Sequence, residues 1–115
     1  MSEELILEHA NSHATDFLVY TGQFCGYCTA AKRLLNSKNL SFTEISFDEQ
    51  PDLRKPVVEA TGHRTVPVIL DIRGEQPVFI GGFDQLQPYL RQSRYPFFQR
   101  IMVLHWNHVP LRMLN

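Results

Sequence analysis

Apolar residues along this chain follow two spacings, one typical of buried strands and one typical of helices that pack on a sheet. Residues 16–20 are a short, β-prone apolar run, which predicts a buried strand. From Gly26 onward, Ala31, Leu34 and Leu35 recur at the spacing of a helix with one apolar face. In chain order we expect a strand over 16–20, a helix over 26–35, a strand over 40–47, a helix over 48–60, strands over 66–72 and 77–80, and a helix over 83–92.

Two of these elements contain a conflict within their own pattern. In the strand over 40–47, the apolar alternation slips between Phe42 and Ile45, which leaves its register open. In the helix over 48–60, Pro56 would cost about 3 kcal/mol at a helix-interior position. That helix therefore either begins near Pro56 or is kinked there.

The order of the elements predicts the topology of the sheet. A helix between the first two strands makes them parallel, because a helical crossover returns the chain to the same end of the sheet. Residues 73–76 include Gly74 and suit a hairpin loop between the last two strands. We therefore expect an α/β fold with a four-stranded mixed sheet flanked by helices.

The same pattern divides the chain into an N-terminal arm over 1–15, one domain over 16–93 and an apolar C-terminal extension over 94–115. The extension carries Trp106 and other large apolar side chains among several arginines. It could pack on its own domain, form a partner or dimer face, or lie on a membrane surface. We favour packing on the domain, because a few arginines among scattered aromatics are weak support for membrane binding.

Composition and charge narrow the functional classes. The chain has 115 residues, of which 43% are hydrophobic, enough for one core and too few for two domains. A net charge of −1 provides no field that would attract nucleic acid or anionic lipid. Glu3 and Glu4 stand where a secretory signal carries positive charge, and no segment approaches the ~20 apolar residues that cross a bilayer. We expect a cytoplasmic protein that binds neither nucleic acid nor membrane.

The candidate chemistry lies in the only two cysteines, Cys25 and Cys28, at the junction of the first strand and the first helix. A disulfide across so short a loop adds little stability, so the pair indicates redox or metal chemistry rather than a structural link. A thiolate at a helix N-terminus is stabilised by unpaired N–H groups and the helix dipole. We therefore expect Cys25 to be the nucleophile and Cys28 to attack the resulting mixed disulfide.

Two other interpretations of the cysteine pair are weaker. Both cysteines could be buried and inert, although their position at a strand-to-helix turn argues against this. Together with His105 and His108 they would complete a formal Cys2His2 set for zinc. The two pairs are separated by most of the domain, far from zinc-finger spacing, so we predict no metal site.

Three motifs give the chain a specific resemblance to a known family. Cys25-Gly-Tyr-Cys28, Thr65-Val-Pro67 and Gly81-Gly-Phe-Asp84 resemble the motifs of glutaredoxins, in the same order and on the same elements, over approximately residues 16 to 93. The resemblance implies a thioredoxin fold, with the first and last helices of the domain on one face of the sheet and the middle helix on the other. It also implies a glutathione-dependent thiol–disulfide oxidoreductase that acts on protein disulfides and on glutathione mixed disulfides through Cys25 and Cys28.

The resemblance further implies a groove in which glutathione binds as co-substrate. A cis Pro67 would present the backbone of Val66 to glutathione, and Tyr27 and Thr65 would line the same groove. The backbone of Phe83, together with Asp84, would hold the γ-glutamyl end. A purely structural interpretation exists for Asp84, which would also suit the last helix as its N-terminal cap.

The sequence also departs from the family pattern. Many glutaredoxins have a lysine for the glycyl carboxylate three residues before the first cysteine, where this chain has Gly22. The cation could instead come from Arg54, Lys55 or Arg64, or glutathione could bind less tightly. Phe83 stands where the family usually has a small residue.

Two of the departures keep alternative functions open. The Gly-Phe pair at Phe83 is similar to glutaredoxin-like redoxins, which draw electrons from thioredoxin reductase. Gly26 follows the first cysteine, as in glutaredoxins that bind a [2Fe–2S] cluster between two subunits with glutathione as a ligand. Exchange with glutathione is the function we expect, and a redoxin or a cluster-binding carrier is the alternative.

Overall fold

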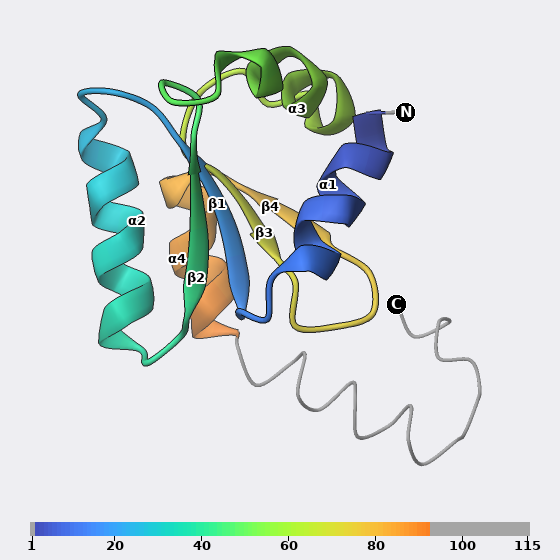
Figure 1. Ribbon diagram of the computed structural model, residues 1–115. Helices are drawn as coiled ribbons and strands as arrows, with labels where there is room; N and C mark the ends of the chain where they lie inside the picture. Colours follow the sequence, from blue (N-terminus) through green and yellow to red (C-terminus); the bar gives the residue numbers. More distant parts are fainter. Residues whose placement is uncertain (1, 93–115) are drawn as a thin grey trace.

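The computed structural model describes residues 2–92 and shows a mixed sheet covered by helices on both faces (Figure 1). The helices are α1 (Ser2–Ser12), α2 (Gly26–Ser37), α3 (Arg54–Thr61), which follows a 3-10 turn over Pro51–Leu53, and α4 (Phe83–Arg91). The strands are β1 (Phe17–Thr21), β2 (Phe42–Ser46), β3 (Val68–Asp71) and β4 (Val78–Gly81). The extension over 94–115 lies outside the described residues.

The sheet has the predicted four strands and mixed pairing, in the order β2-β1-β3-β4. The strand β1 pairs in parallel with β2 and antiparallel with β3, and β3 pairs antiparallel with β4. All five residues of β1 are buried, because β1 is an inner strand and helices cover both of its faces. Among residues 2–92, no helix is long and apolar enough to cross a membrane.

Each face of the sheet carries its own apolar core. On one face, α2 and α4 pack over side chains that include Phe17, Val19 and Ile69. On the other, α1 and α3 pack over Leu18, Tyr20 and neighbouring side chains. The thioredoxin-fold arrangement expected for α2, α3 and α4 is confirmed.

The sequence pattern does not predict the helix α1, which lies within the N-terminal arm over 1–15. Among the side chains of this helix that the structure describes, Ile6 is the only buried one, and it packs in the core beneath α3. The helix is also joined to β1 by a 2.7 Å hydrogen bond between His9 Nδ1 and the hydroxyl of Tyr20. A mostly polar helix that buries few side chains has no clear helical spacing of apolar residues. The sequence pattern therefore did not reveal it.

The two conflicts in the sequence pattern are resolved by the structure. Ile45 packs in the core under α3, whereas Phe42 packs against the core under α2 and α4. The apolar alternation in β2 therefore slips because both faces of the sheet are covered. Pro56 lies in the first turn of α3, where the backbone N–H has no intrahelical partner to lose.

A buried ion pair joins the hairpin to α4 at the end of the sheet where β3 stops. Asp71 is only 5% exposed and accepts hydrogen bonds from Arg73 Nη2 at 2.7 Å and from the Tyr89 hydroxyl at 2.6 Å. Burial alone would raise the pKa of Asp71, but these hydrogen bonds outweigh it and hold the pKa below its usual value. The Asp71 carboxylate therefore stabilises the fold at every pH at which it is ionised.

We expect Asp71→Asn to lower the free energy of unfolding at pH 7 by about 2–3 kcal/mol, because hydrogen bonds to a charged group are lost. The folded-state pKa is lowered, so this contribution is complete above the unfolded pKa and is lost as the pH falls through the folded pKa. Urea unfolding from pH 7 down to pH 2 should show the deficit narrowing only below about pH 4. The exposed Asp52→Asn serves as control, and equal stability of the two variants at pH 7 would contradict the prediction.

Candidate active site

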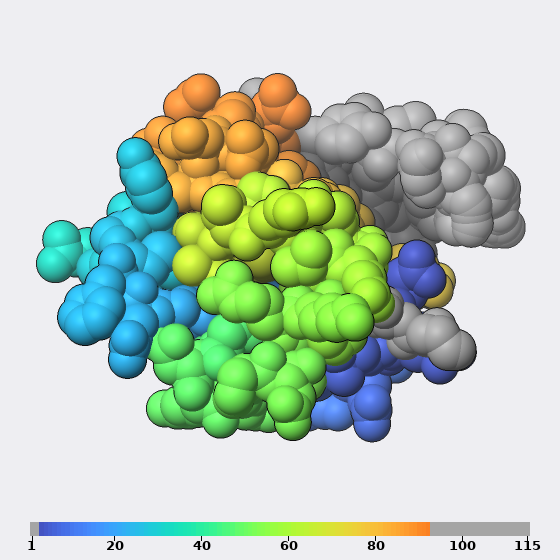
Figure 2. All heavy atoms as spheres, turned by 90° about the horizontal axis from the view of Figure 1, so that it is seen from above, coloured from blue at the N-terminus to red at the C-terminus, as the bar shows by residue number. Residues whose placement is uncertain are grey.

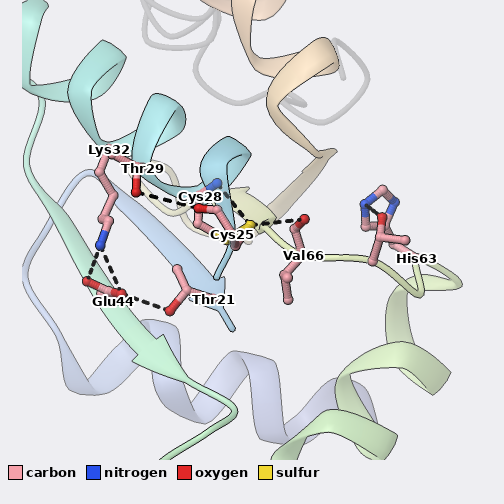
Figure 3. Close-up of a disulfide and its surroundings, with 9 residues drawn as sticks. Thr21, Cys25, Cys28, Thr29, Lys32, Glu44, His63 and Val66 are labelled. Atoms are coloured by element: carbon pink, nitrogen blue, oxygen red, sulfur yellow. Dashed lines mark hydrogen bonds and ion pairs between the residues drawn. A yellow bond between two sulfur atoms is a disulfide. The ribbon is translucent and has the colours of Figure 1, made fainter. Parts of the chain in front are cut away.

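The site is built around the N-terminus of α2, where Cys25 is the N-cap residue. Its backbone is extended, with φ −112° and ψ 100°, and its Sγ accepts a 3.0 Å hydrogen bond from the N–H of Cys28. Figure 3 shows this sulfur at the start of the helix, facing the loop of Val66. A sulfur in the N-cap position receives both a backbone donor and the positive end of the helix dipole, and both stabilise a thiolate.

The two cysteines differ in their access to solvent. They are joined by a disulfide in this structure. Cys25 is partly exposed, whereas Cys28 is 3% exposed and lies one turn inside α2. An incoming disulfide can therefore reach Cys25 but not Cys28, which agrees with the predicted roles of attacking and resolving thiols.

The loop before β3 lies opposite Cys25. It contains the cis peptide bond Val66–Pro67, as expected from the resemblance. Cys25 Sγ is 3.6 Å from the carbonyl oxygen of Val66. Within residues 2–92, neither the N–H nor the carbonyl of Val66 makes a backbone hydrogen bond, so both are open to pairing with an extended peptide.

The start of α4 lies beside this loop. A Cβ placed on Gly82 would be 3.6 Å from the carbonyl oxygen of Pro67, so the two segments are in near contact. The Gly82 N–H donates to Gln85 Oε1 at 2.7 Å, which caps the helix. Asp84 is therefore not the cap, and within the described residues its exposed carboxylate makes no hydrogen bond or ion pair.

An aromatic contact links the cysteine turn to α4. Tyr27 lies between the two cysteines and is 64% exposed. Its ring stacks on that of Phe83, with 6.1 Å between centroids. The bulky Phe83, a departure from the family pattern, thus holds one wall of the candidate groove.

An arginine lies near Gly22, the position at which many glutaredoxins have a lysine. A Cβ on Gly22 would be 3.6 Å from Arg54 Nη2 and only 3.3 Å from Val66 Cγ2. The guanidinium of Arg54 also lies over the ring of Phe47, 5.1 Å from its centroid. Of the three cations considered from the sequence, Arg54 is the one that supplies one of the three atoms nearest to this Cβ.

A polar network behind the site ties α2 to the sheet, and the sequence did not reveal it. Glu44 on β2 accepts hydrogen bonds from Thr21 Oγ1 at 2.8 Å and from Lys32 Nζ at 3.0 Å (Figure 3). Burial alone would raise the pKa of Glu44, but the contacts with Thr21 and Lys32 lower it below the usual value. The network holds the first turns of α2 against the end of β1, from which the cysteine turn departs.

Two further residues near the site were also missed. His63 is partly buried, and its Nε2 lies 3.3 Å from Thr65 Oγ1. Phe24 directly precedes Cys25, has φ 51° and is 98% exposed. No apolar spacing in the sequence points to either residue, because His63 lies in a loop and Phe24 lies in a turn.

The structure does not test the zinc arrangement considered from the sequence. His105 and His108 lie outside the described residues, and residues 2–92 contain no cluster of three or more potential metal ligands. The geometry of the described part favours thiol chemistry at Cys25.

Comparisons with known proteins agree with the site. The family model described as Glutaredoxin matches residues 17–76. The chain is 38% identical over 77 residues to a glutaredoxin of Pseudomonas aeruginosa, covering 67% of this chain and 87% of that protein. It is 38% identical over 69 residues to glutaredoxin 3 of Escherichia coli, covering 59% and 77%. Among solved structures, the buckwheat glutaredoxin–glutathione complex superposes with a TM-score of 0.66 at 25% identity, covering 81% and 82%.

We expect the Cys25 thiol of the reduced protein to titrate more than one pH unit below the free-cysteine pKa of about 8.5, because the N-cap position favours the thiolate. The rate of alkylation by iodoacetamide, followed against pH, measures this midpoint. The same protein unfolded in guanidinium chloride is the control, and its midpoint should return to about 8.5. Equal midpoints in the folded and unfolded protein would contradict the role of the helix terminus.

Proposed function

Given that this chain belongs to the glutaredoxin family and is a thiol–disulfide oxidoreductase, we propose that it draws its electrons from glutathione. Its substrates are protein disulfides and glutathione mixed disulfides, in a cytoplasm that keeps thiols reduced. The observation that carries the proposal is the 3.6 Å approach of Cys25 Sγ to the open backbone of Val66. A glutathione joined to Cys25 would have a strand-like partner at that point.

The two cysteines perform the exchange in sequence. The Cys25 thiolate attacks one sulfur of the client disulfide, and the other client sulfur leaves as a thiolate. Cys28 then attacks the Cys25 sulfur, which releases the reduced client and forms the Cys25–Cys28 disulfide. One glutathione thiolate opens this disulfide to give a mixed disulfide at Cys25. A second glutathione attacks the glutathionyl sulfur, leaving as glutathione disulfide and restoring the Cys25 thiolate.

Three features support a glutathione groove beside Cys25. Within residues 2–92, the N–H and carbonyl of Val66 make no backbone hydrogen bond, and both suit antiparallel pairing with the tripeptide backbone. The N–H groups of Phe83 and Asp84 open α4 without intrahelical partners and suit the γ-glutamyl carboxylate. The uncommitted Asp84 carboxylate suits the γ-glutamyl ammonium, and Arg54 suits the glycyl carboxylate.

We expect Cys25→Ser to abolish exchange with every substrate, because the attacking thiolate is gone. Cys28→Ser should lose reduction of protein disulfides but keep removal of glutathione from a mixed disulfide within a few-fold of the parent rate. The latter reaction needs one thiol when free glutathione resolves the intermediate. Steady-state rates with insulin and with a glutathionylated peptide separate the two routes, and equal losses in Cys28→Ser would rule out the one-thiol route.

We expect Arg54→Gln to raise the KM for glutathione about tenfold or more, because one charge-assisted hydrogen bond contributes about 1.5–3 kcal/mol. Lys55→Gln is the matched control, since it removes an exposed cation one residue along α3. Asp84→Ala should raise the same KM through the other end of the tripeptide. Gly22→Lys is a poor test for two reasons. The new Cβ would lie only 3.3 Å from Val66 Cγ2, and the lysine ammonium would add a second cation near Arg54.

The assay also separates the alternative functions. Wild-type turnover is measured with glutathione and its reductase, and in parallel with thioredoxin reductase alone. Turnover in the second system only would make the protein a redoxin. A brown dimer whose absorbance depends on glutathione would instead indicate a [2Fe–2S] carrier with Cys25 as a cluster ligand.

A further inference from the structure

Phe24 is the one large side chain near the site that folding does not explain. Its ring is 98% exposed, so it contributes almost nothing to the apolar cores. Its φ of 51° lies in the left-handed region, which disfavours a bulky residue and suits glycine. Such a residue persists at a turn when its side chain serves a purpose other than stability.

Phe24 is the chain neighbour of Cys25, the residue to which a reacting client is joined. A client attacked by Cys25 is joined to it through a disulfide, whose Cα atoms lie about 4.4–6.8 Å apart. Neighbouring residues in a chain are about 3.8 Å apart between Cα atoms. The residues that flank the client cysteine therefore come within reach of the side chain next to Cys25.

The ring of Phe24 is more exposed than that of Tyr27 and, unlike it, is not stacked on another ring among the described residues. Tyr27 stacks on Phe83, whereas Phe24 has no ring partner among the described residues. Figure 2 looks onto this end of the molecule and shows the light-blue segment around the start of α2 projecting at one side. The start of α4, in orange, and the segment before β3, in yellow, lie beside it.

We propose that Phe24 is a specificity-determining residue, which selects protein clients that carry a large apolar side chain next to the attacked cysteine. The proposal goes beyond the glutathione-dependent function, because it concerns the client and not the reductant. The charged groups assigned to glutathione, Arg54 and Asp84, lie on α3 and α4, whereas Phe24 brings only an uncharged ring. An apolar side chain on the client gains from contact with this ring, and a small polar one does not.

The test measures mixed-disulfide stability without glutathione. Cys28→Ser protein carrying 2-mercaptoethanol on Cys25 is equilibrated with hexapeptides that contain one cysteine followed by leucine or by serine. The peptide thiolate attacks the Cys25 sulfur, and 2-mercaptoethanol leaves as the thiol, so no net oxidation occurs. The ratio of the two equilibrium constants isolates the flanking side chain, and a failure of glutathione turnover would leave this ratio unaffected.

We expect the leucine peptide to be favoured about five- to tenfold over the serine peptide, as partial burial of one leucine side chain predicts. In Phe24→Ala the preference should fall below about twofold, and Phe24→Trp should keep it. Val78→Ala is the control, since Val78 is an exposed apolar residue at the start of β4, at the opposite end of that strand from Gly81 and the site. It should leave the preference unchanged.

Phe24→Gly separates the ring from the backbone. Glycine relieves the left-handed conformation that alanine retains, but both variants lack the ring. The proposal requires equal preferences in Phe24→Gly and Phe24→Ala. A preference that survives in Phe24→Ala, or that differs between these two variants, would overturn the assignment of specificity to the ring.

Discussion

The site depends on one short hydrogen bond, from the N–H of Cys28 to the sulfur of Cys25. It makes the nucleophile the cap of its own helix, so the group that ends the turn is also the group that reacts. The same turn carries Cys28 into the buried side of α2, where an external disulfide cannot reach it. The geometry of a single helix start therefore supports the order of steps that we propose for exchange.

That helix start is useful only because its surroundings are fixed. The strand β1 is buried along its whole length and ends at Thr21, whose hydroxyl bonds to Glu44 on the neighbouring strand. Glu44 also binds Lys32, so α2 is tied to the sheet one turn beyond Cys28. The Val66 loop and the start of α4 lie side by side, because Pro67 and Gly82 are in near contact. Rigid elements thus position a site that is itself made of turns.

The sequence predicted those parts of the structure that a repeated period or a specific motif encodes. The order of the elements over 16–92, the parallel pairing of β1 with β2 and the β3–β4 hairpin follow from apolar spacing, and the motifs shared with glutaredoxins imply the rest of the sheet. The helix α1 was not predicted because its contact with the core depends mainly on Ile6. The cap of α4 was not predicted, because the sequence suggests Asp84 for that role and only the backbone geometry selects Gln85. Tertiary contacts decide such cases, and local patterns do not record them.

In the function we propose, Arg54 supplies the cation that many glutaredoxins carry as a lysine at the position of Gly22. A side chain at residue 22 would compete for space with Val66, whose backbone must stay open beside Cys25. Arg54 reaches the same region from α3 and lies over Phe47, so its guanidinium is oriented by an aromatic ring outside the cysteine turn. A cation supplied from a separate element leaves the residues between Gly22 and Cys25 without that role, and Phe24 is one of them. Reductant binding and client contact can then change independently, because different elements carry them.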